Sequence, residues 1–386
     1  MHICLLAGRV DRYAGSHAYN RELIRRFAAR GHRVTVVCFE ADESTRSHAD
    51  VLAISVPPQS SVPLLWRFGP AFAAAYASRR FAALNVPPAD VVFAGEHLLI
   101  RPFRKRFPHT PLIYFPMSPV VSHELRNQLS DNWQYRVANR VYSGIQRWAL
   151  EHADLTVRFT HVTCRMLQES YPDLRPRFRV NPVGVDVPGA VAQPPQQGDT
   201  RLLSVGRLAQ WKGQDLALKT LATLKHLSWR FDIIGDGECR QQLEKQAVEL
   251  GLEGRVFFHG FQDDLESWYR QAHLFLFPSR CESLGLVAVD AMAYGVPCLG
   301  IKSDGVVYVN ANDELIRHRE TGLLADNETD FAAQLAYALT SPAELGRLGL
   351  AARRQIASEN TWEAHIARYE ELFGEVLAVR SSRFSA

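Results

Sequence analysis

Residues 274–300 read LFLFPSRCESLGLVAVDAMAYGVPCLG, and this stretch decides the fold. It opens with an apolar run at 274–277 and passes through a polar loop into an apolar segment at 287–294. A second apolar run, 297–300, follows Gly295. This order predicts a strand, a helix ended by glycine, and another strand. Continuous apolar strands joined in this way are typical of a parallel sheet covered by helices on both faces.

The same alternation continues in both directions from this unit. Before it, the pattern predicts strands at 201–205, 231–234 and 256–258 and a helix at 213–224. In the first half of the chain, a helix is expected at 17–29. Strands are expected there at 2–7, 33–39, 51–56, 91–94, 112–115 and 155–159.

The segment 187–199 is rich in Pro, Gly and Gln without periodicity, which indicates a linker. We therefore expect two doubly wound, Rossmann-like α/β domains, 1–186 and 200–361, with a cleft between them. Residues 362–379 form an amphipathic helical pattern with apolar residues at roughly 3.6-residue spacing. We expect residues 362–386 to cross back to the first domain, because the apolar stripe needs a surface to cover.

Composition narrows the class of protein. The chain has 386 residues, which suits two domains, and a net charge of +3, which is too small to indicate a nucleic-acid partner. Its six cysteines are scattered without a CxxC spacing, which favours a reducing compartment and no zinc site. No run approaches the ~20 apolar residues of a membrane span. We expect a cytoplasmic protein. Two interpretations of the aromatic stretch 64–81 and the basic cluster 101–106 stay open: contact with the inner face of a membrane, or a solvated surface beside core helices.

Four loops that follow strands in the second half carry polar or glycine signals, at the sheet edge where open α/β sheets bind ligands. After 205, Gly206, Arg207 and Lys212 precede a helix, which suits a diphosphate; two solvated surface cations are the alternative. After 234, Gly235 begins a Gly-Asp-Gly turn that permits close backbone approach to a ligand or simply reverses the chain.

The loop after 277 carries Glu282 and leads into the helix. The N–H groups of Ser283, Leu284, Gly285 and Leu286 are free to face a phosphate or a sugar hydroxyl. Asp290 follows Glu282 by eight positions inside an apolar helical pattern, where a carboxylate needs a partner. A ribose diol or a buried Arg or Lys would serve.

These residues resemble glycosyltransferase family 4, whose E-x7-E region usually has a form close to PSxxExFGLVxxEAMAxGxPV. The segments FDIIGDGE, HGFQDDLESWYRQAHLFLFPS, HRETGLL and NPVGVD resemble the family too. So does Tyr13-Ala14-Gly15-Ser16, which is similar to the glycine loop beside the acceptor. The resemblance implies the GT-B fold, two Rossmann-like domains with a helix that returns to the first.

The resemblance also implies an activity: retaining transfer of a hexose-type sugar from a nucleotide diphosphate sugar, with UDP, GDP, dTDP and ADP as candidate nucleotides. The acceptor would be a hydroxyl of a small molecule, a glycan or a lipid-linked molecule, as in bacterial envelope or metabolite glycosylation. Family members use no metal and no cofactor, so the pair Asp263 and Asp264 is interpreted as a polar turn. Reaction is expected on the donor's front face, with the leaving phosphate assisting deprotonation of the acceptor.

Roles follow for the matching positions. Glu282, Arg207 and Lys212 would be catalytic: Glu282 binds hydroxyls of the donor sugar, and the two cations neutralise the leaving diphosphate with help from the N–H groups of residues 284–286. Asp290 would hold the ribose. The loop 259–261, with Gly260 and Phe261, would line the nucleobase.

Three departures from the family pattern matter. Asp290 replaces a glutamate and is one methylene shorter. A longer loop, 303–315, replaces the usual GGxPE loop, so that Asp304, Gly305 and Glu314 align only loosely. Pro116 and Met117 stand where the family commonly has a histidine. Acceptor-side candidates are therefore Gly15, Ser16 and the nearest polar pair, Glu96 and His97, for which helix capping is the alternative role.

Two other functions are considered. A GT-B nucleotide-sugar epimerase would need acid and base residues that the sequence does not reveal. A non-catalytic dinucleotide-binding protein is disfavoured because the glycines around residues 8, 15 and 206 form no GxGxxG pattern.

Overall fold

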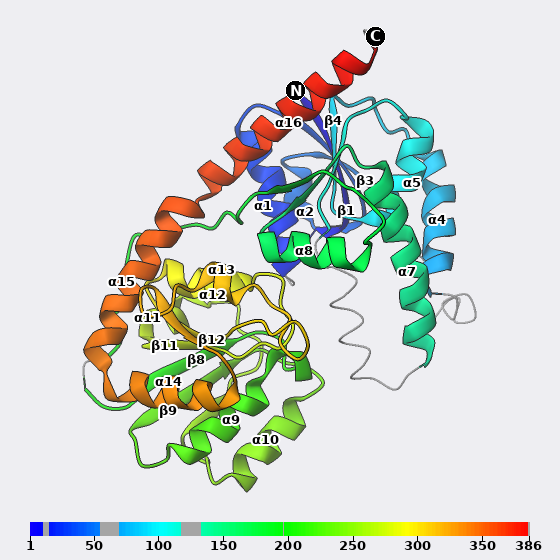
Figure 1. Cartoon of the computed structure of the whole chain (residues 1–386). Helices are drawn as coiled ribbons and strands as arrows, with labels where there is room; N and C mark the ends of the chain where they lie inside the picture. The colour runs from blue at the N-terminus through cyan, green and yellow to red at the C-terminus, as the bar shows by residue number, and fades with distance from the viewer. Residues whose placement is uncertain (11–14, 55–68, 117–132, 196, 385–386) are drawn as a thin grey trace. The chain divides into compact units, whose positions relative to one another are not determined.

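The computed structural model describes residues 1–10, 15–54, 69–116, 133–195 and 197–384, and it divides into two compact units (Figure 1). The first unit comprises Met1–Asn181 and His365–Ala386, and the second Pro182–Ala364. The segment 187–199, expected as a linker, falls within the second unit. There the Ala192 N–H donates to the Tyr294 carbonyl at 2.7 Å and the Gln193 N–H to the Arg270 carbonyl at 2.8 Å.

The first unit is built on a seven-stranded parallel sheet with the order β3-β2-β1-β4-β5-β6-β7. Its central strands are apolar on both faces, which requires helices on each side. The strands are β1 (His2–Val10), β2 (Arg33–Ala41), β3 (Asp50–Ala53), β4 (Val91–Ala94), β5 (Leu112–Tyr114), β6 (Leu155–Arg158) and β7 (Phe178–Val180). The helices are α1 (Gly15–Ala29), α2 (Glu43–Arg46), α4 (Gly69–Ala83), α5 (His97–Arg106), α7 (Trp133–His152), α8 (His161–Ser170) and α16 (Trp362–Phe384).

The C-terminal helix α16 packs in the first unit from His365 onward, as its apolar stripe predicts. Tyr369 is fully buried, and its ring lies 4.8 Å from that of Phe93 on β4. The Tyr19 hydroxyl on α1 contacts His365 Nε2 at 2.6 Å. A buried aromatic stripe and a polar contact therefore fasten α16 onto the sheet.

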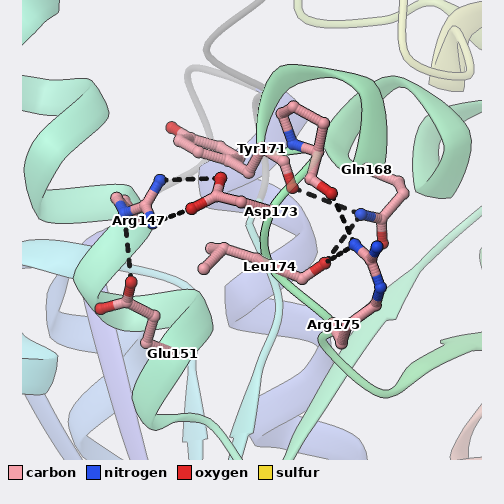
Figure 2. Close-up of polar contacts among 8 residues, drawn as sticks. Arg147, Glu151, Gln168, Tyr171, Asp173, Leu174 and Arg175 are labelled. Atoms are coloured by element: carbon pink, nitrogen blue, oxygen red, sulfur yellow. Dashed lines mark hydrogen bonds and ion pairs between the residues drawn. The ribbon is translucent and has the colours of Figure 1, made fainter.

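Polar contacts hold the connection between α8 and β7 in place (Figure 2). Arg147 on α7 pairs through two nitrogens with both carboxylate oxygens of Asp173. The Gln168 amide of α8 donates to the carbonyls of Tyr171 and Leu174 at 3.3 and 2.9 Å. These contacts satisfy backbone carbonyls beyond the end of α8 and lead the chain into β7.

The second unit repeats the architecture with a six-stranded parallel sheet, β10-β9-β8-β11-β12-β13. Its strands are β8 (Thr200–Val205), β9 (Trp229–Ile234), β10 (Val256–Phe258), β11 (Leu274–Phe277), β12 (Cys298–Ile301) and β13 (Gly322–Ala325). Its helices are η1 (Gln210–Lys212), α9 (Gln214–Thr223), α10 (Arg240–Glu249), α11 (Glu266–Gln271), α12 (Leu286–Ala293), α13 (Asn312–Leu315), α14 (Glu328–Thr340) and α15 (Pro342–Glu359). Both sheets have the strand order of doubly wound folds, and the expected two Rossmann-like units are confirmed.

The sequence pattern misses the last strand of each sheet. β7 has only three residues, two of them partly buried and Arg179 exposed, so it carries no apolar run. β13 begins at Gly322, where an added Cβ would lie 2.6 Å from the Cys298 carbonyl oxygen. The predicted strand 51–56 and the aromatic stretch 64–81 lie partly outside the described residues. In the part of the chain that the structure describes, no helix is long and apolar enough to cross a bilayer.

Candidate functional site

The structure brings two of the predicted residues, Lys212 and Glu282, into direct contact. Lys212 ends the short helix η1 after β8, and Glu282 lies in the loop after β11. The Lys212 Nζ atom donates a hydrogen bond to Glu282 Oε2, and both side chains are largely buried, at 19% and 16% exposure. β8 pairs directly with β11, so the loops that follow these strands are neighbours although 70 residues separate the two side chains.

Backbone and side-chain contacts fix the two loops against each other. The Arg280 N–H donates to the Trp211 carbonyl at 2.8 Å. The Arg280 guanidinium pairs through two nitrogens with Asp215 of α9, at 2.7 and 2.9 Å. Gly213, between η1 and α9, has φ of 73°, and a Cβ there would lie 2.0 Å from the Pro278 carbonyl oxygen. Only glycine fits, because this position needs a left-handed backbone and a close approach at once.

We expect Gly213→Ala to lower the free energy of unfolding by roughly 3 kcal/mol or more, because it adds a backbone clash to left-handed strain. Gly254→Ala is the matched control: φ is 74° and nothing lies within 4 Å of the added Cβ. Strain alone should cost roughly 1–2 kcal/mol there. Urea unfolding measures both, and equal losses would contradict the close packing at Gly213.

The N-terminal end of α12 presents a row of free donors beside this pair. Within the described residues, the backbone N–H groups of Ser283, Leu284, Gly285 and Leu286 donate no hydrogen bond. Gly285 has φ of 81°, and a Cβ there would lie 2.2 Å from the Phe277 ring, so the loop turns tightly over β11. Free N–H groups at a helix start, with a lysine alongside, form a site that suits anionic oxygen.

Arg207 lies in the loop after β8 and makes a different contact. Its Nε atom donates to Glu238 Oε2 at 2.9 Å, and its side chain is 64% exposed. The guanidinium also lies 5.9 Å from the Trp211 ring centroid. An exposed pair of this kind is weak, so Arg207 can exchange Glu238 for a more highly charged partner.

The glycines after β8 and β9 bring these loops together. Gly206 has φ of 148°, and a Cβ on Gly235 would lie 2.0 Å from the Gly206 carbonyl oxygen. A Cβ on Gly237 would lie 2.4 Å from the Leu208 carbonyl oxygen. The Gly235 N–H donates to the Gly260 carbonyl at 2.8 Å, which joins the loop after β10. Glycine is therefore needed at positions 235 and 237 because the loops after β8 and β9 approach each other too closely for a side chain.

The loop after β10 presents one exposed aromatic ring, that of Phe261, at 59% exposure. His259, two residues before Phe261, takes part in a network of polar and aromatic contacts that the sequence pattern did not predict. His259 Nε2 lies 2.8 Å from Oδ1 of the buried Asp232, and the His259 ring lies 4.3 Å from that of Trp268. Arg230 donates to the same carboxylate at 2.8 Å. The signal for this network in the sequence was Asp232, a charged residue inside the otherwise apolar predicted strand 231–234.

Asp290 lies on α12 without a cationic partner. In the described part of the chain it forms no ion pair, so the alternative of a buried Arg or Lys is not what the structure contains. Burial, and to a smaller extent the negative charge of Asp186, together raise the pKa of Asp290 from 3.8 to about 7. The side chain is therefore a carboxyl poised between its neutral and charged forms near neutral pH.

The long loop 303–315 is closed on itself and joined to the Glu282 loop. Asp304 Oδ1 accepts the N–H groups of Val306, Val307 and Tyr308, each at 2.8 Å. Burial would raise the pKa of Asp304, but these N–H groups hold it below its usual value. The Glu282 N–H donates to the Val309 carbonyl at 3.2 Å. The Asp304 carboxylate is thus occupied within its own loop.

Asp263 and Asp264 lie just before α11, and the Asp264 carboxylate accepts the Ser267 N–H at 3.3 Å, as in a polar turn. Among the described residues, no group of three or more His, Cys, Asp or Glu side chains could hold a metal ion.

On the acceptor side, Glu96 and His97 lie where β4 leads into α5. Glu96 caps α5 by accepting the Leu98 N–H at 3.0 Å, which is the structural alternative considered for it. His97 Nδ1 lies 3.6 Å from Glu96 Oε1, and its buried Nε2 atom has no hydrogen-bond partner in the part of the chain that the structure describes. Gly15 and Ser16 begin α1, whereas Tyr13, Ala14 and Met117 lie outside the described residues.

The basic cluster 101–106 contains one buried arginine and three exposed cations. Arg104 is 9% exposed and pairs with Asp154 at 2.7 Å. Arg106 donates to the Leu84 carbonyl at 2.5 Å, and the Arg101 guanidinium lies 5.8 Å from the Trp148 ring centroid. Arg101, Lys105 and Arg106 are nevertheless exposed, so lipid contact and a solvated surface beside core helices both stay predictions.

Two family models match consecutive parts of the chain. The model described as "Glycosyltransferase Family 4" matches residues 13–187, and "Glycosyl transferases group 1" matches residues 191–355. N-acetyl-alpha-D-glucosaminyl L-malate synthase of Bacillus anthracis is 33% identical over 147 residues, which are 38% of this chain and 37% of that protein. The matched stretch spans 34–37% of the length of this and two other curated relatives.

Two solved structures have a similar fold. Sucrose-phosphate synthase from Thermosynechococcus elongatus superposes with a TM-score of 0.80 at 20% identity, covering 98% of this chain and 99% of that one. Anabaena HepE in complex with UDP and glucose superposes with a TM-score of 0.69 at 18% identity, covering 96% and 99%. Both structures have the GT-B fold that the sequence resemblance implies.

Proposed function

Because the chain belongs to glycosyltransferase family 4, we propose that it transfers a hexose-type sugar from a nucleotide diphosphate sugar to an acceptor hydroxyl, with retention at the anomeric carbon. The observation that carries this proposal is the Lys212–Glu282 contact beside the free N–H groups of residues 283–286. It combines a cation and backbone donors for a diphosphate with a carboxylate for sugar hydroxyls.

In the proposed reaction, the bond between the anomeric carbon and the diphosphate oxygen breaks, and its electron pair passes to the diphosphate. Lys212, the N–H groups of residues 284–286 and Arg207, released from Glu238, stabilise that charge without a metal ion. Glu282 holds hydroxyls of the sugar. The acceptor oxygen forms the new bond on the same face, and its proton passes to the leaving phosphate.

The donor and acceptor classes follow from chemistry and from the relatives. Phe261 offers an exposed ring for a nucleobase, and Asp290 a carboxyl for ribose hydroxyls. The Anabaena structure holds UDP and glucose, which supports UDP as the first nucleotide to test. The name of the Bacillus relative joins an N-acetylglucosaminyl group to L-malate, which supports a small-molecule acceptor. The name of a Rhizobium meliloti relative refers to lipopolysaccharide core biosynthesis, which supports a glycan or lipid-linked acceptor, so both classes are to be tested.

A thermal-shift panel with UDP, GDP, dTDP, ADP and their sugars tests the donor site. One nucleotide should raise Tm more than the others at equal concentration, because stabilisation by a ligand that binds only the folded protein grows with the logarithm of its concentration divided by its Kd. Glu282→Ala should lose the additional response to the matching nucleotide sugar while keeping that to the nucleotide. EDTA should leave both responses unchanged. Preferential stabilisation by NAD would instead support a dinucleotide-binding protein.

Turnover separates the transferase from the epimerase. Incubation of the matching nucleotide sugar without acceptor should leave the sugar's configuration unchanged, as followed by proton NMR. With an accepted hydroxyl compound, the same spectra should show an anomeric configuration equal to that of the donor. Epimerisation without acceptor would sink the transferase proposal, and an inverted product would sink the retaining mechanism.

A further inference from the structure

Arg158 is a buried cation that no described residue neutralises. It is the last residue of β6 and is 2% exposed. Within the described part of the chain its guanidinium forms no ion pair and donates no hydrogen bond, and its Nε atom is completely buried. Such a charge is costly to bury without a partner.

The guanidinium nevertheless stays charged at neutral pH. Burial lowers the pKa of Arg158 to about 10, while Cys164, Tyr114 and Tyr369 oppose this shift. No carboxylate is among the groups that act on it. The neighbourhood therefore lacks the negative charge that a purely structural arginine would be expected to have.

Arg104, in the same unit, shows what a structural buried arginine looks like. It donates to the His152 carbonyl at 3.1 and 2.9 Å and to the Thr110 carbonyl, and it pairs with Asp154 at 2.7 Å. All of these acceptors belong to the protein. Arg158 has a similar burial and none of these contacts, so its partner is to be sought outside the described residues.

The position of Arg158 indicates where that partner comes from. β4, β5 and β6 are neighbours in the sheet, and parallel sheets of this kind bind ligands at the carboxyl ends of their strands. Arg158 lies at that end of β6. Two positions earlier, on the same face, Thr156 Oγ1 is also buried and has no hydrogen-bond partner among the described residues. Tyr114, which pairs in register with Thr156, lies close enough to both Glu96 and Arg158 to respond to their charges.

We infer that Arg158 binds an anionic oxygen group, a carboxylate or a phosphate, on the acceptor substrate. This inference rests on the proposed function in assigning the anion to the acceptor. A guanidinium presents two parallel N–H groups that match either group, and a buried one discriminates strongly against a neutral analogue. Arg158 would thus determine which class of hydroxyl compound is accepted.

Anion-dependent stability of the full chain tests the inference. Tm is measured with UDP held saturating, so that the donor site is filled, at constant ionic strength in chloride, inorganic phosphate or malonate. The wild type should be stabilised by phosphate or by malonate over chloride, and the responding anion identifies the group. Arg158→Met should lose this response by at least tenfold in apparent affinity, and Arg158→Lys should retain part of it.

Arg165→Met is the matched control, because Arg165 is exposed on α8 and the variant removes the same charge. It should keep the wild-type response.

In chloride alone, Arg158→Met should melt no lower than the wild type, since it removes an unpaired buried charge. A wild type indifferent to both anions, or an Arg158→Met variant that melts well below it in chloride, would overturn the inference. UDP binding by each variant is read in the same experiment, so a failed donor site is distinguishable from a failed anion site.

Discussion

Lys212→Met is expected to lower kcat/KM for sugar transfer by about 10²–10³-fold, the usual effect of removing one preorganised charge that faces a leaving group. The methionine keeps the unbranched stem and removes only the ammonium that contacts Glu282. Because that ammonium should act most strongly when charge develops on the diphosphate, the loss should fall mainly on kcat. Initial rates over a range of donor concentrations separate kcat from KM.

Two further variants distinguish catalysis from structure. Lys302→Met removes the same charge from an exposed pair with Asp326 in the same unit and should leave the rate near that of the wild type. Lys212→Met also leaves Glu282 partly buried without its cation, which should lower stability. Adding Glu282→Gln should restore that stability but not the rate. Recovery of the rate in the double variant would show that Lys212 acts only by neutralising the charge of Glu282 and not on the leaving diphosphate.

Asp290→Asn is expected to remove a pH-dependent loss of stability of up to about 4 kcal/mol. The pKa of Asp290 is about 7 in the folded protein against 3.8 for the ordinary carboxyl. Between these values the folded state holds more protons than the unfolded state, so the free energy of unfolding falls as pH rises. The stability is intact below pH 3.8 and is lost progressively up to about pH 7.

Urea unfolding of wild type and Asp290→Asn at half-unit pH steps measures this effect. The difference between the two proteins should change by up to about 1.4 kcal/mol per pH unit across that window, with the variant gaining on the wild type. Asp186→Asn removes the neighbouring negative charge and should move the decline to lower pH. Parallel stability curves for wild type and Asp290→Asn would contradict a raised pKa at this residue.

The local sequence pattern predicted most strands and helices, because each is a short apolar run or an amphipathic helical segment. The strands 91–94, 256–258 and 274–277 agree with the structure at both ends. β7 and β13 were missed because their pairing depends on neighbouring strands rather than on their own composition. The predicted donor-side residues were chosen because they follow strand ends, where side chains are free for a ligand, and their binding of a donor stays a prediction.

Partnerships between distant residues could not be predicted in the same way. The sequence offered Arg207 and Lys212 as one cation pair, but the structure gives them the separate partners Glu238 and Glu282. For Asp290 the sequence left two partners open, a ribose diol or a buried Arg or Lys. It gave no signal that Arg158 would be buried without an anion among the described residues. Each of these facts depends on which strands are adjacent.

The stretch around residues 274–300 by itself predicted a doubly wound unit, because strand and helix periods and turn glycines are local properties of the chain. Its motif carries the family resemblance, and the role of Glu282 in the donor site stays a prediction from that resemblance. Only the tertiary structure decided that β8 lies beside β11 and so places Lys212 on Glu282. It alone decided that Gly213 must admit the Pro278 carbonyl and that Arg158 pairs with none of the described residues. Burial and charge pairing arise from contacts across many residues, and a local pattern does not encode them.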